Sequence, residues 1–189
     1  MKPTVGIALT GSFCTLKKTF SLMEKLKEDY TLIPILSERV AQTDTRFFSA
    51  REVMEQAETI CGTPPLVSIC DVEPLGPKNK LDLLLVCPCT GNTLSKTALG
   101  ITDSTVTMAI KSHRRNGGKV LLALSTNDAL SGSAKSLGQI LDKKGFFLVP
   151  LRQDDPKGKP SSLQCDFDAV PAAVAAALDG IQLQPMFLP

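Results

Sequence analysis

Six short and nearly continuous apolar runs are the first pattern along the chain. They are TVGIAL (4–9), YTLIPILS (30–37), LVSIC (66–70), LDLLLVC (81–87), KVLLALS (119–125) and FFLVPL (146–151). Runs of this length without strict alternation are typical of strands buried on both faces of a parallel sheet. The sequence therefore predicts a strand at each of these positions.

Helical spacing separates several of these runs. Two series of apolar residues step by three and four positions: Leu16, Phe20, Met23, Leu26 and Tyr30, and Leu130, Ala134, Leu137 and Leu141. Such series predict helices that pack on a sheet, and the alanine-rich stretch 169–180 predicts a last helix with Gly180 just past its end. Alternating strands and helices predict an α/β fold. We expect a doubly wound, mostly parallel sheet with helices on both faces, a Rossmann-like three-layer sandwich.

Length and charge narrow the classes of protein to consider. The chain has 189 residues, 43% of them hydrophobic, and we expect a single domain over residues 1–189. Its 21 basic and 19 acidic residues give no general attraction to nucleic acid or to an anionic membrane. The first apolar run is too short for a signal peptide or a membrane span, so we expect a cytoplasmic protein.

The cysteines predict reduced thiols and no metal site. Six are present, at positions 14, 61, 70, 87, 89 and 165. Cys87 and Cys89 are one residue apart, whereas zinc-binding pairs are usually separated by two to four residues and need further Cys or His ligands. Either thiol becomes a nucleophile only if a helix N-terminus lowers its pKa, and otherwise both are small apolar packing groups.

Two polar loops follow predicted strands, where ligands of open parallel sheets bind. In TGSFCT (10–15), Gly11 allows a tight turn, and Ser12 or Thr15 can cap the next helix and leave backbone N–H groups for an anion. In CPCTGNT (87–93), Pro88 ends the strand and a helix begins at Asn92 or Thr93. That second loop is either an anion site or simply a helix cap. The GxGxxG pattern is absent, which favours one bound phosphate over two.

The second loop carries a family resemblance. PCTGNTLSKTALGITDS (88–104) resembles the PxSxNTxxKxAxGxxDN signature of the flavin-binding cysteine decarboxylase superfamily, and TGS (10–12) matches the other phosphate-loop motif of that family. The resemblance implies that FMN is the cofactor. The cofactor-binding residues that it implies are Gly11, Ser12, Ser37, Thr90, Asn92 and Thr93.

Further segments resemble a narrower family, the flavoprotein subunits of bacterial dipicolinate synthases. They are TDTRF (43–47), EPLGPKNKLD (73–82), STNDAL (125–130), KPSSLQ (159–164) and LQP (183–185). The resemblance implies NADP-linked oxidation of dihydrodipicolinate to dipicolinate in the mother cell of a spore-forming bacterium. It places NADP on a partner, the dipicolinate synthase A subunit, and it implies a homo-oligomer with flavin at subunit boundaries. The basic helix end around Arg114 and the loop 152–164 are candidate contacts, although that loop is equally well interpreted as a surface connection.

Departures from the wider superfamily argue against decarboxylation. The decarboxylases use a histidine near the flavin, but residues 38–86 contain none. The one histidine, His113, lies in a basic helix end, where cations complement the helix C-terminus. The substrate motif PxMN of the family is replaced by residues 124–127, of which only Asn127 carries over. We therefore expect a different substrate.

A substrate with two carboxylates requires forked or charged donors. Arg46, in the loop after the second predicted strand, is the favoured candidate, with Asn127 and Lys159 behind it; the alternative for Arg46 is a solvated surface side chain. No residue is identified for proton transfer. Two classes of function stay open: an oxidoreductase subunit, and a non-catalytic subunit that holds flavin, substrate or partner. A flavin-dependent decarboxylase is disfavoured.

Overall fold

A computed structural model describes residues 1–76 and 81–189. Its strands are β1 (Thr4–Leu9), β2 (Thr31–Leu36), β3 (Leu83–Cys89), β4 (Lys119–Thr126), β5 (Phe146–Leu148), β6 (Leu151–Arg152) and β7 (Leu163–Cys165). They form one sheet in the order β2-β1-β3-β4-β7-β6, and β5 also pairs with β4. The pairs among β1 to β5 are parallel, and β7 pairs antiparallel with β4 and β6.

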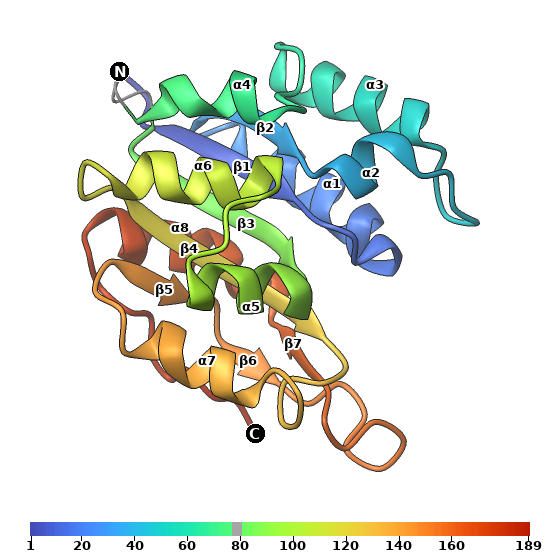
Figure 1. Ribbon diagram of the computed structural model, residues 1–189, viewed down its shortest axis with the longest axis vertical. Helices are drawn as coiled ribbons and strands as arrows, with labels where there is room; N and C mark the ends of the chain where they lie inside the picture. Colours follow the sequence, from blue (N-terminus) through green and yellow to red (C-terminus); the bar gives the residue numbers. More distant parts are fainter. Residues whose placement is uncertain (77–80) are drawn as a thin grey trace.

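Helices cover both faces of this sheet. They are α1 (Leu16–Leu26), α2 (Glu38–Gln42), α3 (Ala50–Cys61), α4 (Ile69–Val72), α5 (Gly91–Leu99), α6 (Thr105–Arg114), α7 (Ala134–Leu141) and α8 (Val170–Leu178), with short 3₁₀ helices η1 (Phe13–Thr15), η2 (Glu73–Leu75) and η3 (Phe167–Ala169). Figure 1 shows α5 and α6 in front of β3 and β4, and α8 behind them. The predicted fold class, a mostly parallel sheet between layers of helices, is confirmed.

The centre of the sheet is as apolar as the sequence pattern requires. Every residue of β3 is buried, and so are Val5 and Ile7–Leu9 of β1. A buried Leu or Ile contributes about 1.5–3 kcal/mol relative to an exposed one, so these strands contribute much of the stability of the core. At the far end of the chain Gly180 has φ of 79°, a left-handed conformation that favours glycine. The predicted end of the last helix is confirmed.

Two predicted strands differ from the structure. In 66–70, Leu66 makes only an isolated bridge with Ile35, and the segment then turns into α4. The reason is a capping box: the Ser68 hydroxyl accepts from the amide of Asp71, whose carboxylate accepts from the Ser68 amide at 2.9 Å. The predicted strand 146–151 is two strands, because Pro150 cannot donate a ladder hydrogen bond and the chain leaves β4 for β7 at that point.

Both predicted helices that follow a series of apolar residues are shorter than the series. Helix α1 ends at Leu26, so Tyr30 lies beyond it. Leu130 precedes α7 and is 50% exposed, and Leu141 at the end of that helix is 44% exposed. The spacing of apolar residues therefore predicted helices longer than those observed. Leu130 and Leu141 lie at exposed ends, whereas Tyr30 packs against the core after the helix has ended.

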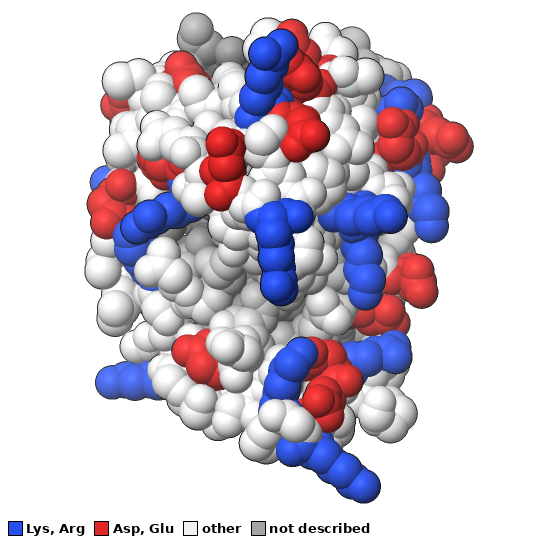
Figure 2. Space-filling model, turned by 90° about the vertical axis from the view of Figure 1, so that its right-hand side faces the viewer, with Lys and Arg blue, Asp and Glu red and all other residues white. Residues whose placement is uncertain are grey.

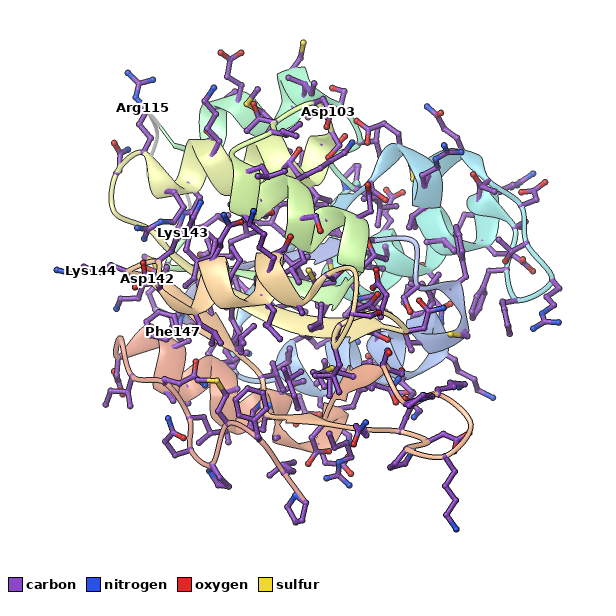
Figure 3. All side chains as sticks on the ribbon, turned by 60° about the horizontal axis from the view of Figure 1, so that its bottom comes forward. Asp103, Arg115, Asp142, Lys143, Lys144 and Phe147 are labelled. Atoms are coloured by element: carbon purple, nitrogen blue, oxygen red, sulfur yellow. The ribbon has the colours of Figure 1, made fainter. Side chains whose placement is uncertain are left out.

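Helix α7 also stabilises the end of its neighbour. Lys143, which lies just after α7 (Figure 3), donates from Nζ to the carbonyl oxygens of Ala98 at 2.7 Å and Thr97 at 3.4 Å. A cation at the C-terminus of α5 complements the partial negative charge there. This contact links the C-terminal end of α5 to the residues that follow α7.

Two further observations concern parts of the chain. In the described residues, no helix combines the length and the apolar composition that crossing a bilayer requires. Residues 77–80 of the predicted motif EPLGPKNKLD lie outside the described residues.

Candidate functional site

Thr10 ties together the loops that follow β1 and β3. Its side chain is 1% exposed, and its hydroxyl donates to the carbonyl oxygen of Pro88 at 2.7 Å and accepts from the amide of Thr90 at 3.0 Å. Buried backbone groups need such partners. The two loops predicted to bind an anion therefore meet at one point of the sheet edge.

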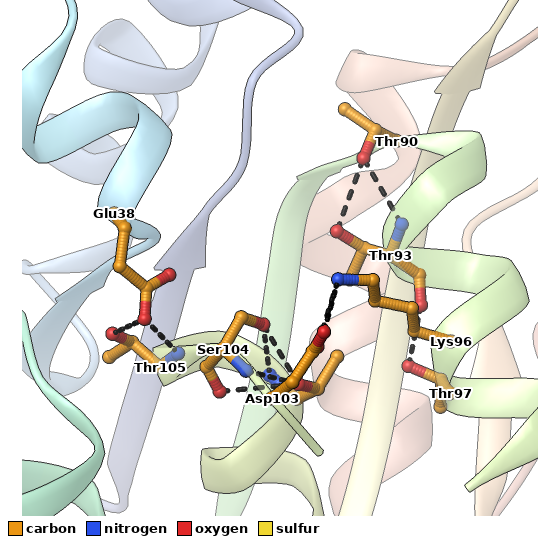
Figure 4. A network of polar contacts seen from close by, with 9 residues as sticks. Glu38, Thr90, Thr93, Lys96, Thr97, Asp103, Ser104 and Thr105 are labelled. Atoms are coloured by element: carbon orange, nitrogen blue, oxygen red, sulfur yellow. Dashed lines mark hydrogen bonds and ion pairs between the residues drawn. The ribbon is translucent and has the colours of Figure 1, made fainter. Parts of the chain in front are cut away.

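Helix α5 begins earlier than predicted. The strand continues past Pro88 to Cys89 with a shift of register, and the helix starts at Gly91 rather than at Asn92 or Thr93. Thr90 is the cap: its hydroxyl accepts from the amide of Thr93 at 3.3 Å and lies 3.1 Å from the Thr93 hydroxyl (Figure 4). The first-turn amides of Gly91 and Asn92 precede the intrahelical bonds and are the ones that can bind an anion.

Gly91 is required by a close approach to β4. A Cβ atom at this position would lie 2.7 Å from the Thr126 hydroxyl, 2.8 Å from the Ser133 hydroxyl and 2.9 Å from a carboxylate oxygen of Asp128. These distances are shorter than van der Waals contact, so any other residue would displace the start of α5. The glycine of the sequence motif thus sets where the helix N-terminus lies.

The loop after β1 differs in detail from the prediction. Neither Ser12 nor Thr15 caps a helix with its side chain. The Ser12 hydroxyl instead lies 3.2 Å from that of Ser125 at the end of β4, and the Thr15 hydroxyl donates to the carbonyl oxygen of Ser12 at 2.8 Å. Ser12 therefore links the ends of β1 and β4, which are not neighbours in the sheet.

A cavity of about 1070 Å³ lies where these loops meet, on the scale of a site for a cofactor and a substrate. Its walls come from the loops after β1, β3 and β4, from the loop before α3 and from the segment before β7. Seven of the nine residues predicted for the cofactor or the substrate line it: Gly11, Ser12, Arg46, Thr90, Asn92, Asn127 and Lys159. These residues are far apart in the sequence, and the fold brings them together.

Ser37 and Thr93 do not line the cavity. Thr93 is occupied by its contact with Thr90. Ser37 follows β2, and its buried hydroxyl has no hydrogen-bond partner among the described residues. A buried hydroxyl without a partner is costly. Because Ser37 lies outside the lining of the cavity, its role in cofactor binding stays a prediction.

The charges around the cavity are balanced. Arg46 and Lys159 face two acidic residues that the sequence did not single out, Asp128 and Asp154. Lys159 pairs with Asp154 at 3.1 Å, and this partner raises the pKa of the lysine. Because the formal charges cancel, anion binding here depends on amides and hydroxyls rather than on net charge.

The two unpredicted carboxylates differ in how they are held. Asp128 accepts from the hydroxyls of Thr126 at 2.6 Å and Ser133 at 3.0 Å, and lies against the start of α5. Its position just after β4 could have been found with the same rule that located the other loops. Asp154 lies in the long loop 152–164, and its place in the cavity depends on how that loop folds back.

Arg46 keeps its guanidinium available. The side chain is exposed and lies over the ring of Phe47, with 4.8 Å from Cζ to the ring centroid. It forms no ion pair within residues 1–76 and 81–189. Of the three predicted substrate ligands, it is therefore the cation without an acidic partner, since Lys159 already has one.

The buried cysteines are packing groups. Cys87 and Cys89 are 0% exposed, and burial raises the pKa of Cys87 to about 12 and that of Cys89 further. Such thiols stay protonated and are poor nucleophiles. Cys14, by contrast, is exposed and lines the cavity, although no sequence motif singled out its thiol.

The interpretation of the basic helix end needs correction. His113 is 4% exposed, and its Nε2 lies 3.0 Å from the carbonyl oxygen of Lys119. Burial lowers its pKa, so it is a neutral packing residue rather than a cation. Arg114 lies over the ring of Phe146 and donates to the carbonyl oxygen of Lys144 at 2.8 Å. This end of α6 is thus held within the chain.

Contacts within the second half of the signature motif, and one just after it, hold helices α5 and α6 in position. Lys96 of α5 pairs with Asp103 at 2.8 Å, and Glu38 accepts from the amide and the hydroxyl of Thr105 at 2.8 and 2.9 Å (Figure 4). These contacts fix α5 to the segment before α6 and fix α6 to α2. The motif therefore contains both residues of the cavity and residues that hold its helix in position.

A helix N-terminus, two serine- and threonine-rich loops and a large cavity at the carboxyl edge of a parallel sheet define a flavoprotein-type site. The model of the flavoprotein family matches residues 1–174, and the chain belongs to that family. It is similar to the B subunit of dipicolinate synthase from Bacillus subtilis (strain 168), with 40% identity over 97% of this chain and 92% of the relative. The narrower resemblance indicated by the sequence motifs is thus confirmed.

Solved structures agree with this assignment. The crystal structure of the dipicolinate synthase B subunit from Bacillus halodurans matches with a TM-score of 0.90 and 37% identity, over 100% of this chain and 99% of that one. A dodecameric FMN-dependent UbiX-like decarboxylase from Escherichia coli O157:H7 matches with a TM-score of 0.64 and 20% identity, over 93% of each chain. The second match shows a shared fold alone.

Proposed function

We propose that the chain is the flavin-binding subunit of a dipicolinate synthase and takes part in the NADP-linked oxidation of dihydrodipicolinate to dipicolinate. The observation that carries this proposal is the cavity: seven of the nine residues selected from the sequence for cofactor and substrate line one space, in a chain that is 40% identical to the B subunit of a dipicolinate synthase. The names of the similar proteins support a role in dipicolinate synthase, the sequence resemblance implies the NADP-linked reaction, and the cavity supports the location that we propose for it.

The cavity fits FMN on the chemistry of its donors. The amides of Gly91 and Asn92 suit a single phosphate, and the hydroxyls of Ser12 and Thr90 suit the phosphate or the ribityl chain. The hydroxyl of Ser37 has no partner among the described residues but does not line the cavity, so it stays a predicted contact of the cofactor. When bound, FMN supplies hydride-transfer chemistry. The residues of this chain would hold the phosphate end of the cofactor at the edge of the sheet and thereby orient it.

Arg46 is the residue that we propose for the substrate carboxylates. Its guanidinium can donate two parallel hydrogen bonds to one carboxylate, and its position over Phe47 limits its freedom. Asn127 and Lys159 complete the proposed set on the walls formed after β4 and before β7. Asp128, which has no ion-pair partner among the described residues, repels a dianion and so favours the side of Arg46, whereas the charge of Asp154 is offset by Lys159.

We further propose that the partner, the dipicolinate synthase A subunit, binds NADP and that this chain assembles with copies of itself. The GxGxxG fingerprint is absent, so the two-phosphate cofactor has no motif of its own here. Since Arg114 is engaged within the chain, the exposed loop 152–164 is the better candidate for a contact between copies. Light scattering of the flavin-loaded protein at micromolar concentration should then report more than a monomer.

Reconstitution tests the proposed reaction. The FMN-loaded chain, the partner subunit and their mixture are each supplied with NADP and the dihydrodipicolinate-type substrate, and NADPH formation is followed. We expect turnover from the mixture alone. Robust turnover by this chain without the partner would contradict its assignment as one subunit of a two-part enzyme. Full activity of the partner without this chain would make this chain a non-catalytic binding protein.

A further inference from the structure

A second cavity, of about 520 Å³, adjoins the first. It is lined by one face of α1, by β6 and β7, and by η3. Gln164 of β7 lines both cavities, so a ligand in the second has the first directly beside it. The residues proposed for flavin and substrate do not line this second cavity, which needs an explanation of its own.

The walls of this cavity are rich in unpaired basic side chains. Lys17, Lys18 and Lys25 all come from α1, and none of them forms an ion pair with any residue that the structure describes. Arg152 also lines the cavity but pairs with Asp166 at 2.9 Å. Figure 2 shows one face of the molecule, on which Lys and Arg side chains lie among Asp and Glu side chains. The chain therefore presents an excess of positive charge in a concave place.

The opposite wall offers different chemistry. Phe167 of η3 is half-buried, and Nζ of Lys18 lies 5.7 Å from the centroid of its ring. Asp168 beside it is exposed. An aromatic ring can stack on a base, a carboxylate can accept from ribose hydroxyls or an amino group, and lysines can bind phosphates. A helix face that is simply exposed to solvent would carry the lysines but would have no aromatic ring and no carboxylate beside them.

We propose that the second cavity binds the adenosine phosphate part of a nucleotide, with the phosphates on the lysines of α1 and the base against Phe167. This inference rests on the proposed function, in which a pyridine nucleotide must come close to the flavin cavity. The partner subunit then binds the nucleotide, and the second cavity of this chain adds contacts to its adenosine phosphate part, next to the first cavity that Gln164 also lines. Strand β7, which contains Gln164, thereby lies between the two proposed binding sites.

Calorimetric titration of adenosine 2′,5′-bisphosphate into the FMN-loaded full chain tests the proposal. We expect saturable binding of about one ligand per chain with a Kd below about 1 mM. The triple variant Lys17→Gln, Lys18→Gln, Lys25→Gln should weaken binding at least about 30-fold, because three charge-assisted contacts are lost. A matched triple variant, Lys111→Gln, Lys135→Gln, Lys144→Gln, removes the same charge elsewhere and should change the affinity less than about twofold.

A second variant separates stacking from charge. Phe167→Leu keeps an apolar side chain but removes the ring, so it should weaken binding of the adenosine bisphosphate about fivefold and leave pyrophosphate binding unchanged. Absence of saturable binding, or equal losses in the two triple variants, would overturn the proposal. Bound flavin is measured by absorbance in the same samples. If flavin is absent, the proposed function fails, and titration of the flavin-free chain still tests this cavity.

Discussion

Removing the hydroxyl of Thr10 tests whether the junction of the two loops is built as described. Thr10→Val keeps the shape of the side chain but removes the donor to Pro88 and the acceptor for Thr90. The carbonyl oxygen of Pro88 is then left buried without its partner, at a cost of about 1–3 kcal/mol. The amide of Thr90 is only partly buried and should cost about 1 kcal/mol. The added methyl group returns about 0.8 kcal/mol.

The expected net loss is about 1–3 kcal/mol in the free energy of unfolding. Urea unfolding of both proteins measures it, provided that the slope with denaturant stays the same. Thr59→Val is the matched control: its hydroxyl also donates to a backbone carbonyl, that of Glu55 at 2.7 Å, but on the exposed surface of α3. It should change stability by less than about 0.5 kcal/mol. A loss for Thr10→Val below about 1 kcal/mol, or no larger than the control, would refute the reasoning.

Three further variants address the cofactor, the substrate and pH. Asn92→Asp adds negative charge at the start of α5 and should weaken FMN binding by about 1–3 kcal/mol in a fluorescence titration, whereas Gln139→Glu on α7 should not. Arg46→Ala, assayed with the partner, should raise KM more than it lowers kcat, because a carboxylate held equally in both states contributes uniform binding; a loss confined to kcat would contradict this role. Burial lowers the pKa of His113 below the unfolded value of about 6.5, so its contribution to stability is present above that pH and is lost as pH falls through the folded pKa. His113→Gln should therefore lose less stability than wild type between about pH 7 and pH 5.5 in urea unfolding.

The sequence predicted the sheet and the loops of the site because both depend on local patterns. Continuous apolar runs located the central strands, and the rule that ligands bind at carboxyl ends of parallel strands selected loops that line one cavity. Two of the errors were avoidable. Ser68 and Asp71 have the spacing of a capping box, and Pro150 interrupts the run 146–151.

The remaining features depend on distances that no local pattern contains. The approach of Gly91 to Asp128 follows from how α5 packs on the end of β4. The burial of His113 follows from the fit of its ring against Gly118, which leaves no room for a Cβ atom there. The isolated hydroxyl of Ser37 likewise becomes visible only when every neighbouring atom is placed.

The central claim is that the cavity at the edge of β1, β3 and β4 binds FMN. Equilibrium titration of the purified chain with FMN, followed by the visible absorbance and the fluorescence of the flavin, tests it most directly. We expect saturation at about one flavin per chain and weaker binding when Thr90 is replaced by Val, because the cap that positions the first turn of α5 is lost. No saturable binding of FMN, or an affinity that Thr90→Val leaves unchanged, would contradict the assignment of this site.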